Sequence, residues 1–299
     1  MPQITWPAEI TTISMAEYLA LDALSSSACH TLLTRSPAHA YEKRFHPAVA
    51  TSAMDLGTVV HRVLLERNEN GISLVEADDW RTKVARQARD EAHEAGQIPL
   101  LAKAVDEVRA MVDVADTFIQ TSELAGIFDR GKPEQTLLWC EGAVRCKARP
   151  DWLDNDLHTL VHFKTTQGSA NQESFVSRMV DMGYDVAAAF YARGMQQVCG
   201  VLPSQLLTAF LVQETEPPYA CALIGLAPSL MEIAVVKVEH ALHVWETCLA
   251  EQRWPAYPVQ ICYAEARPWQ ITQMAEKALS WNDYDAYERI TELAGGRSQ

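Results

Sequence analysis

The sequence predicts a mixed α/β fold in which helical segments lie before and after one sheet. Apolar residues recur at helical spacing in the first 125 residues, alternating and β-branched runs begin at residue 133, and helical spacing returns after residue 170. No linker separates these regions, which favours a single α/β or α+β domain over residues 1–299. It has three parts: a helical part (1–130), a sheet with flanking helices (131–253) and a C-terminal tail (254–299).

The composition agrees with a globular chain. Of 299 residues, 48% are apolar and 21% are charged, which allows a sizeable core. No apolar run approaches the ~18 residues of a membrane span, and the N-terminus lacks a secretory signal, so we expect a cytoplasmic protein without a membrane partner. A net charge of −14 argues against nucleic-acid binding unless basic residues are concentrated in a channel.

Cysteine spacing excludes several kinds of site. The seven cysteines are irregularly spaced and form no CxxC pair. This pattern argues against a disulfide framework and against a zinc or iron–sulfur site. We therefore expect free thiols in a reducing compartment.

The first helices are short. Residues 14–34 read as two helices, and Ser25–Ser27 can cap the second. Ser36 and Pro37 begin a further helical turn that ends near Pro47.

Residues 52–66 form the clearest helix of the N-terminal part. Ser52 can cap it and Asp55 falls in its first turn. Gly57 and His61 are four residues apart and therefore share one face. Further helices are expected over 79–95 and 99–125.

The middle of the chain is predicted to form strands. We expect strands over 134–140, 143–150 and 157–164, joined by turns at Glu141-Gly142 and Asn155-Asp156. These strands would form a three-stranded meander.

The second half returns to helix. Residues 171–199 are expected to be one helix, capped by Asn171 and ended by Gly200. Residues 204–214 and 219–225 would form a hairpin, followed by a long helix over 228–253. The tail is rich in Trp and Tyr and shows only weak periodicity.

Polar residues at the ends of two predicted strands suggest a phosphodiesterase site. Asp151 follows Arg149-Pro150 at the end of the second strand, and Lys164 ends the third. Residue 162 lies on the same face as Lys164 because strand side chains alternate. A carboxylate that holds a divalent cation and a nearby lysine are what phosphodiester hydrolysis requires. Residue 162, however, is a histidine.

Six stretches, taken in order, resemble a known family. They are YLALDALSSSACHTLLTRSPAHAYEK, AMDLGTVVHRVLLE, EQTLLWCEGAVRCKARPDWL, VHFKTT, GYDVAAAFY and RWPAYP. Together they resemble the RecE-type exonuclease domain of the PD-(D/E)xK nuclease superfamily, which includes RecB-like nucleases and phage lambda exonuclease. The resemblance implies a restriction-endonuclease-like α/β core with a mixed central sheet flanked by helices.

The resemblance also implies the roles of individual residues. His61, Asp151, His162 and the backbone carbonyl of Phe163 would hold Mg²⁺, with Mn²⁺ as the alternative ion. Lys164 would assist the attacking water. Asp151, His162 and Glu134 would complete the catalytic group.

The expected DNA contacts lie beside this site. Arg145, Lys147 and Arg149 alternate along one strand and so share a face, which is either a solvated face or a stripe that contacts phosphates. The resemblance adds three further candidates: Thr165, Thr166 and Tyr191.

Two positions depart from the family pattern. His162 stands where the D-x-K motif has its aspartate, and Ala187 stands where a glutamine usually precedes Tyr191 by four residues. Imidazole is a poor Mg²⁺ ligand but suits Mn²⁺, Fe²⁺ or Zn²⁺. His162 is therefore either a retained metal ligand or an inactivated position.

Two functions follow. The resemblance implies a metal-dependent exonuclease that digests one strand of a duplex end, 5′→3′, leaving 3′ tails for a RecT-like annealing protein. It also implies a homo-oligomer and a phage or prophage origin. The alternative is an inactive relative that binds DNA ends or a recombination partner. A Cas4-like iron–sulfur nuclease is excluded because Cys248 and Cys262 are too far apart for its cluster motif.

Overall fold

The computed structural model describes residues 6–44 and 52–295, and it divides the chain into two compact units. The first unit is Met1–Ala256 and the second is Tyr257–Gln299. The single domain expected over residues 1–299 stays a prediction, and the two units are described separately. Every predicted site residue belongs to the first unit.

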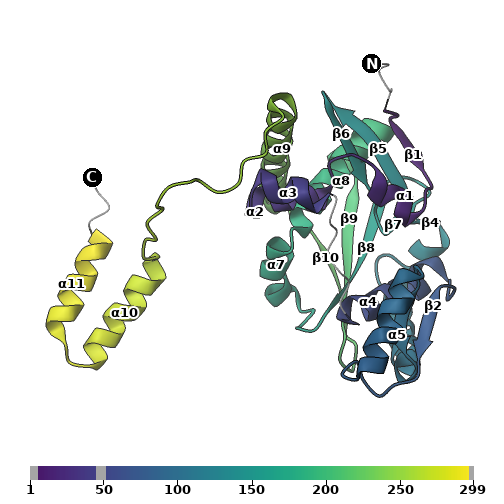
Figure 1. The fold of residues 1–299 in the computed structure, drawn as a ribbon, viewed down its shortest axis with the longest axis horizontal. Helices are drawn as coiled ribbons and strands as arrows, with labels where there is room; N and C mark the ends of the chain where they lie inside the picture. The colour runs from purple at the N-terminus through teal and green to yellow at the C-terminus, as the bar shows by residue number, and fades with distance from the viewer. Residues whose placement is uncertain (1–5, 45–51, 296–299) are drawn as a thin grey trace. The chain divides into compact units, whose positions relative to one another are not determined.

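A five-stranded mixed sheet forms the centre of the first unit, as the sequence predicted (Figure 1). The central pair, β8 and β9, is parallel, and the remaining neighbours are antiparallel. The strands in spatial order are β10 (Cys221–Gly225), β9 (Leu207–Glu214), β8 (Thr159–Thr166), β7 (Trp152–Asp154) and β4 (Gly131–Pro133).

The predicted three-stranded meander is wrong, because its strands belong to two sheets. β5 (Thr136–Glu141) and β6 (Val144–Ala148) pair with β1 (Glu9–Thr11) in a separate sheet. The break follows from Pro150, which has no N–H to donate to a sheet ladder. The chain bends there and enters the central sheet at Trp152. Asp151 consequently lies in the bend and not at the end of a strand.

Most predicted helices are present with shifted bounds. The helices of the first unit are α1 (Met15–Ala20), α2 (Ser26–Thr34), α3 (Pro37–Lys43), α4 (Ser52–His61), the π-helix η1 (Arg62–Glu66), α5 (Lys83–Glu94), α6 (Val105–Gln120), α7 (Gln172–Asp181), α8 (Tyr184–Cys199) and α9 (Pro228–Glu251). Short 3₁₀ turns lie at Ala102–Ala104, Ile127–Asp129 and Pro203–Gln205. The predicted end near Pro47 and the structure around it lie outside the described residues.

Two predicted helices are interrupted. The segment 99–125 begins with a strand, β3 (Ile98–Leu101), which pairs in parallel with β2 (Ile72–Val75). The segment 171–199 is two helices, because Gly183 between them adopts a left-handed φ of 73°. A side chain there would also collide with the ring of His30. This turn separates α7 from α8.

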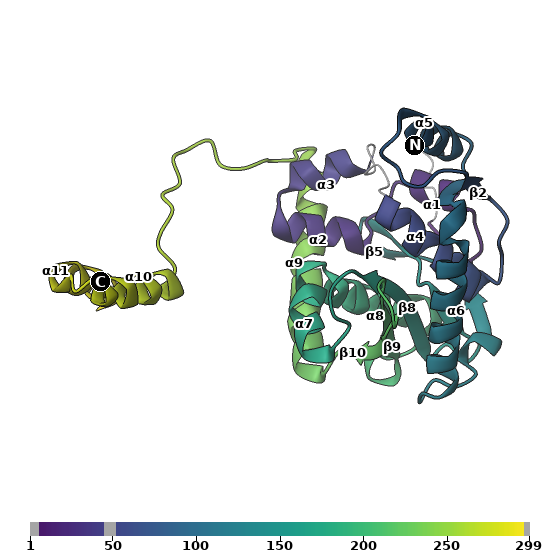
Figure 2. The same ribbon diagram turned by 90° about the horizontal axis from the view of Figure 1, so that it is seen from below.

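Helices cover both faces of the central sheet (Figure 2). α4 and α6 pack on one face against Val161 and Phe163 of β8. α8 and α9 belong to the core on the other face, which includes Leu160. Side chains of a strand alternate between faces, so β8 sends residues 160 and 162 toward α8. Within the described residues, no helix combines the length and apolar character needed to cross a membrane.

Helix α4 approaches β8 closely at Gly57. A Cβ atom at this position would lie 2.7 Å from Thr165 Oγ1, inside normal contact distance. The glycine that precedes His61 by one helical turn is therefore explained by packing. It lets the C-terminal end of α4 reach the end of β8.

The second unit is a pair of helices, although its sequence showed only weak periodicity. Helices α10 (Pro268–Ser280) and α11 (Tyr284–Gly295) pack together through a small buried cluster of Ile271, Ala275, Ala278 and Ala286. Trp269, Trp281 and Tyr284 are exposed.

We expect Gly57→Ala to lower the free energy of unfolding by about 1–3 kcal/mol, because overpacking of this size displaces neighbouring atoms. Urea denaturation measures the loss. Thr165→Ala removes the opposing oxygen, so the double variant should lose less stability than the sum of the two single variants. Strict additivity would contradict the proposed contact.

Candidate metal centre

Two carboxylates meet at the edge of the central sheet. β4 pairs with β7 so that Pro133 lies opposite Trp152, and the next pair outward is Glu134 and Asp151. The backbone N–H of Glu134 donates to the carbonyl oxygen of Asp151 at 3.1 Å. Glu134 adopts a left-handed φ of 55°, which is uncommon for a residue other than glycine.

His61 completes a group of three potential ligands. It ends α4, directly before the π-helix η1, and π-helical turns occur frequently at functional sites. Its Nε2 lies 3.5 Å from Glu134 Oε1 and 3.6 Å from Asp151 Oδ2.

The donor set suits a divalent cation. Among the described residues, His61, Glu134 and Asp151 form one group of ligand atoms that all lie within 4.8 Å of one another. One imidazole and two carboxylates can hold Mg²⁺ or Mn²⁺. The resemblance had placed Glu134 in the catalytic group but not among the ligands.

Asp151 is held by the strand that carries the lysine. Its Oδ2 accepts hydrogen bonds from the backbone N–H of Phe163 at 2.9 Å and from Lys164 Nζ at 3.0 Å. The group of Phe163 that contacts the site is thus its N–H, whereas the expected contact was its carbonyl. Lys164 lies next to the carboxylate, as the spacing predicted.

Charges in the site favour an ionised Asp151 and a protonated Lys164. Burial would raise the pKa of Asp151, but Lys164 and the two histidines hold it well below its usual value. Burial would lower the pKa of Lys164, but the charge of Asp151 raises it above its usual value. The pKa of His61 is also raised, because hydrogen bonding and charge from Asp151 outweigh burial.

Glu134 forms an ion pair with an arginine. Arg149 Nε donates to Glu134 Oε2 at 2.6 Å. Burial, together with the charge of Asp151, raises the pKa of Glu134 despite this arginine and His61. Each carboxylate of the group therefore has one cationic neighbour.

His162 lies behind Asp151 in the core. Its ring stacks with those of Tyr191 and Phe210, at centroid distances of 4.9 and 5.2 Å. Its Nδ1 lies 3.5 Å from Asp151 Oδ1. Burial lowers the pKa of this imidazole.

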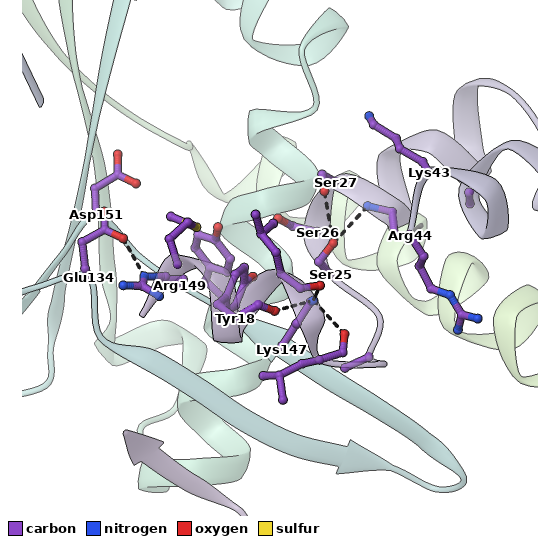
Figure 3. Close-up of a pocket in the computed structure, with 17 residues that line it drawn as sticks. Tyr18, Ser25, Ser26, Ser27, Lys43, Arg44, Glu134, Lys147, Arg149 and Asp151 are labelled. Atoms are coloured by element: carbon purple, nitrogen blue, oxygen red, sulfur yellow. Dashed lines mark hydrogen bonds and ion pairs between the residues drawn. The ribbon is translucent and has the colours of Figure 1, made fainter. Parts of the chain in front are cut away.

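A pocket of about 350 Å³ opens beside the metal centre. Figure 3 shows Glu134 and Asp151 at one end, Lys43 and Arg44 at the other, and three serines between them. The serines are Ser25–Ser27, at the N-terminus of α2, where backbone N–H groups favour anions. Arg149 also lines the pocket, and none of the described residues hydrogen bonds to its buried Nη1.

The predicted basic stripe is covered by the N-terminal segment. Arg145, Lys147 and Arg149 do share a face, but Arg145 lies over the ring of Trp6 and Arg149 over that of Tyr18. Lys147 is only 7% exposed.

The ammonium of Lys147 is occupied by the backbone. It donates to the carbonyl oxygens of Tyr18 at 2.7 Å and Leu21 at 2.9 Å. Burial lowers its pKa to about 8. The expectation that Lys147 contacts phosphate is therefore corrected: this lysine anchors the segment around α1.

Of the other expected DNA contacts, Thr165, Thr166 and Tyr191, only Tyr191 lines the pocket. Thr165 packs against Gly57, and Thr166 is buried and accepts hydrogen bonds from Arg178 and from the Gly168 N–H. Buried Thr166 is thus occupied by protein groups. Tyr191, by contrast, lines the pocket and can meet a ligand there.

The sequence interpretation missed the pocket itself. Tyr18 and Ser26 line it, whereas the sequence pattern predicts only a helix cap at Ser25–Ser27. The available signal was a run of three serines at a helix start, since such a start also binds anions.

We expect the stability of the metal-free protein to depend on Asp151 in a pH-dependent manner. A carboxylate whose pKa is lowered by folding stabilises the protein above its unfolded pKa, about 3.9, and this contribution disappears as pH falls through the folded pKa. The stability loss in Asp151→Asn should therefore be largest near neutral pH and shrink on acidification.

Urea unfolding in EDTA between pH 3 and 7 measures this difference. Asp156→Asn removes a carboxylate at an exposed turn and serves as the control. A deficit in Asp151→Asn that stayed constant with pH would contradict the assignment.

Comparison with solved structures supports the fold. A crystal structure of a candidate exonuclease from Eubacterium rectale superimposes with a TM-score of 0.56 at 11% identity, over 86% of this chain and 96% of the other. At this identity the match shows a shared fold alone. The structure of SSO0001 matches at 14% identity, over 66% of this chain and 87% of the other, with a TM-score of 0.27 that carries no argument.

Sequence comparison gives the family. No curated protein sequence matches the chain. Residues 25–266, however, match the family model described as a PDDEXK-like domain of unknown function (DUF3799). This match spans most of the chain, including the bend at Asp151 and the strand with Lys164. The restriction-endonuclease-like fold and the superfamily predicted from the motifs are thereby confirmed, and the chain belongs to this PDDEXK-like family.

Proposed function

We propose that this protein is a metal-dependent DNA nuclease that acts on duplex ends. The observation that carries the proposal is the group of His61, Glu134 and Asp151, with Lys164 3.0 Å from Asp151. A divalent ion held there would supply Lewis-acid chemistry, stabilising charge on the phosphate and making water more acidic. The family match supports a nuclease class but not a particular substrate.

The protein groups have distinct roles in this proposal. Asp151 stays ionised and accepts hydrogen bonds, because its pKa lies well below its usual value. Lys164 stays protonated, so its ammonium serves as a hydrogen-bond donor to the attacking water or the phosphate and not as a base. His61 and Glu134, together with Asp151, would hold the ion.

The adjoining pocket supports action at an end. Its volume of about 350 Å³ falls in the range of small-ligand sites and suits a single nucleotide. Arg149 and the N-terminus of α2 favour a phosphate there. A terminal nucleotide in this pocket would place the next phosphodiester beside Asp151.

The finer features of the proposal come from the resemblance. They are 5′→3′ digestion that leaves 3′ tails, an annealing protein as partner, and assembly into a homo-oligomer. Hydrolysis of strands labelled separately at each end gives the polarity.

A second candidate function is favoured by His162. An imidazole in place of the D-x-K aspartate removes one negative charge from the site, as in a homologue that binds DNA ends without cutting. This alternative predicts duplex binding without cleavage in Mg²⁺ or Mn²⁺. Cleavage by the natural sequence would exclude it.

We expect Lys164→Ala to reduce the cleavage rate by about 10²–10³-fold, as loss of one preorganised donor typically does. Degradation of an end-labelled duplex in Mn²⁺, and separately in Mg²⁺, measures the rate. Lys277→Ala on α10, an exposed lysine of the second unit, should leave the rate unchanged. Full activity in Lys164→Ala would overturn the assigned site.

We expect Lys43→Met to weaken DNA binding several-fold and to lower the slope of log K against log salt by about one. Lys43 is exposed and lines the pocket. Fluorescence anisotropy with a labelled duplex, in EDTA and at several salt concentrations, measures both quantities. Lys103→Met, at an exposed lysine that does not line this pocket, is the matched control. Equal affinities for the two variants would argue against DNA in the pocket.

A further inference from the structure

His162 occupies a closed, aromatic position beside the metal centre. Its side chain is 3% exposed and stacks with Tyr191 and Phe210 at interplanar angles of 30° and 27°. Its position is therefore fixed by packing, independently of any ion.

The ring does not belong to the group of ligands. Within the described residues, the compact set of ligand atoms consists of His61, Glu134 and Asp151, without His162. His162 Nδ1 faces Asp151 Oδ1, whereas His61 and Lys164 approach Oδ2. The imidazole thus contacts the oxygen of Asp151 that lies away from the other partners.

The surroundings of the buried His162 Nε2 favour one tautomer of this ring. His162 Nε2 is buried and receives no hydrogen bond from the described residues. A neutral ring with its proton on Nδ1 directs its single N–H toward Asp151 and leaves only a lone pair without a partner. In this tautomer the imidazole would face Asp151 through an N–H without adding a charge to the centre.

A carboxylate at position 162 would have a different effect. It would place a second negative charge about as close to Asp151 as the imidazole is, and two carboxylates at that distance repel each other unless one is protonated or a cation binds nearby. Here the carboxylates of the site already have cationic neighbours, Lys164 for Asp151 and Arg149 for Glu134. Little uncompensated negative charge is left to attract a hard cation.

We propose that His162 is a positioning residue that sets metal selectivity: it holds Asp151 in place without a cation and makes the centre favour Mn²⁺ over Mg²⁺. The inference rests on the proposed use of this centre for a divalent ion. Because the metal centre has a low net negative charge, the binding of a divalent ion depends more on the ring nitrogen of His61. Mn²⁺ accepts nitrogen ligands more readily than Mg²⁺, which prefers oxygen.

The test is metal binding by the full chain in the absence of DNA. Titration calorimetry with MgCl₂ and with MnCl₂, together with the electron paramagnetic resonance signal of free Mn²⁺, gives both dissociation constants. His162→Asp should tighten Mg²⁺ binding by about tenfold or more, because the added charge acts at short range. Mn²⁺ should gain less, so that the preference for Mn²⁺ narrows by about threefold or more.

Two further variants keep the test decisive. His240→Asp makes the same change in net charge at an exposed position on α9 and should change neither constant. His162→Asn keeps a neutral donor near Asp151 and should keep the Mn²⁺ affinity within about threefold of the natural protein, since no ligand is lost. Circular dichroism melting curves establish that each variant is folded.

The outcomes separate the inference from the proposed function. A Mg²⁺ affinity unchanged in folded His162→Asp, or loss of Mn²⁺ binding in folded His162→Asn, would overturn the inference. If His162→Asp does not fold, the His162→Asn result alone decides, because a ligand role predicts loss of Mn²⁺ there. The predicted metal affinities without any DNA cleavage would support the inference and refute the nuclease.

Discussion

The site depends on the bend that places Asp151 between two sheets. Pro150 ends the ladder of the small sheet, and Trp152 begins the pairing in the central sheet. In this bend the carbonyl of Asp151 holds Glu134, while its side chain accepts from the strand with Lys164. Both carboxylates and the lysine are therefore positioned by backbone pairing, which is more rigid than side-chain packing alone.

Charge compensation is the second property of the site. Two half-buried carboxylates lie close together, yet each has a cation within hydrogen-bonding distance. Burial of unpaired carboxylates would be costly. The pairing allows the group to form before any ion binds. Arg149, which pairs with Glu134, also lines the pocket. The metal centre and the pocket therefore share one arginine, so that substitution of Arg149 would affect both.

The motifs in the sequence predicted that His61, Asp151 and Lys164 belong to one site, and the structure brings these three side chains together. Their roles in that site stay predictions. Contacts between segments far apart in the sequence could not be predicted from such motifs. The alternation along residues 145–149 correctly placed Arg145, Lys147 and Arg149 on one face. It could not show that the segment around α1 covers this face. The position of Glu134 depends on a left-handed backbone conformation that its residue type does not favour. The helices of the second unit were missed because small alanines, and not large apolar residues, form most of their contact.

The boundary between the two units has a practical meaning for evolution and for protein engineering. All residues of the metal centre and of the pocket precede Tyr257, and the family match ends at residue 266. Helices α10 and α11 belong to the second unit. The same separation makes the segment after residue 256 a natural place for exchanging one C-terminal module for another.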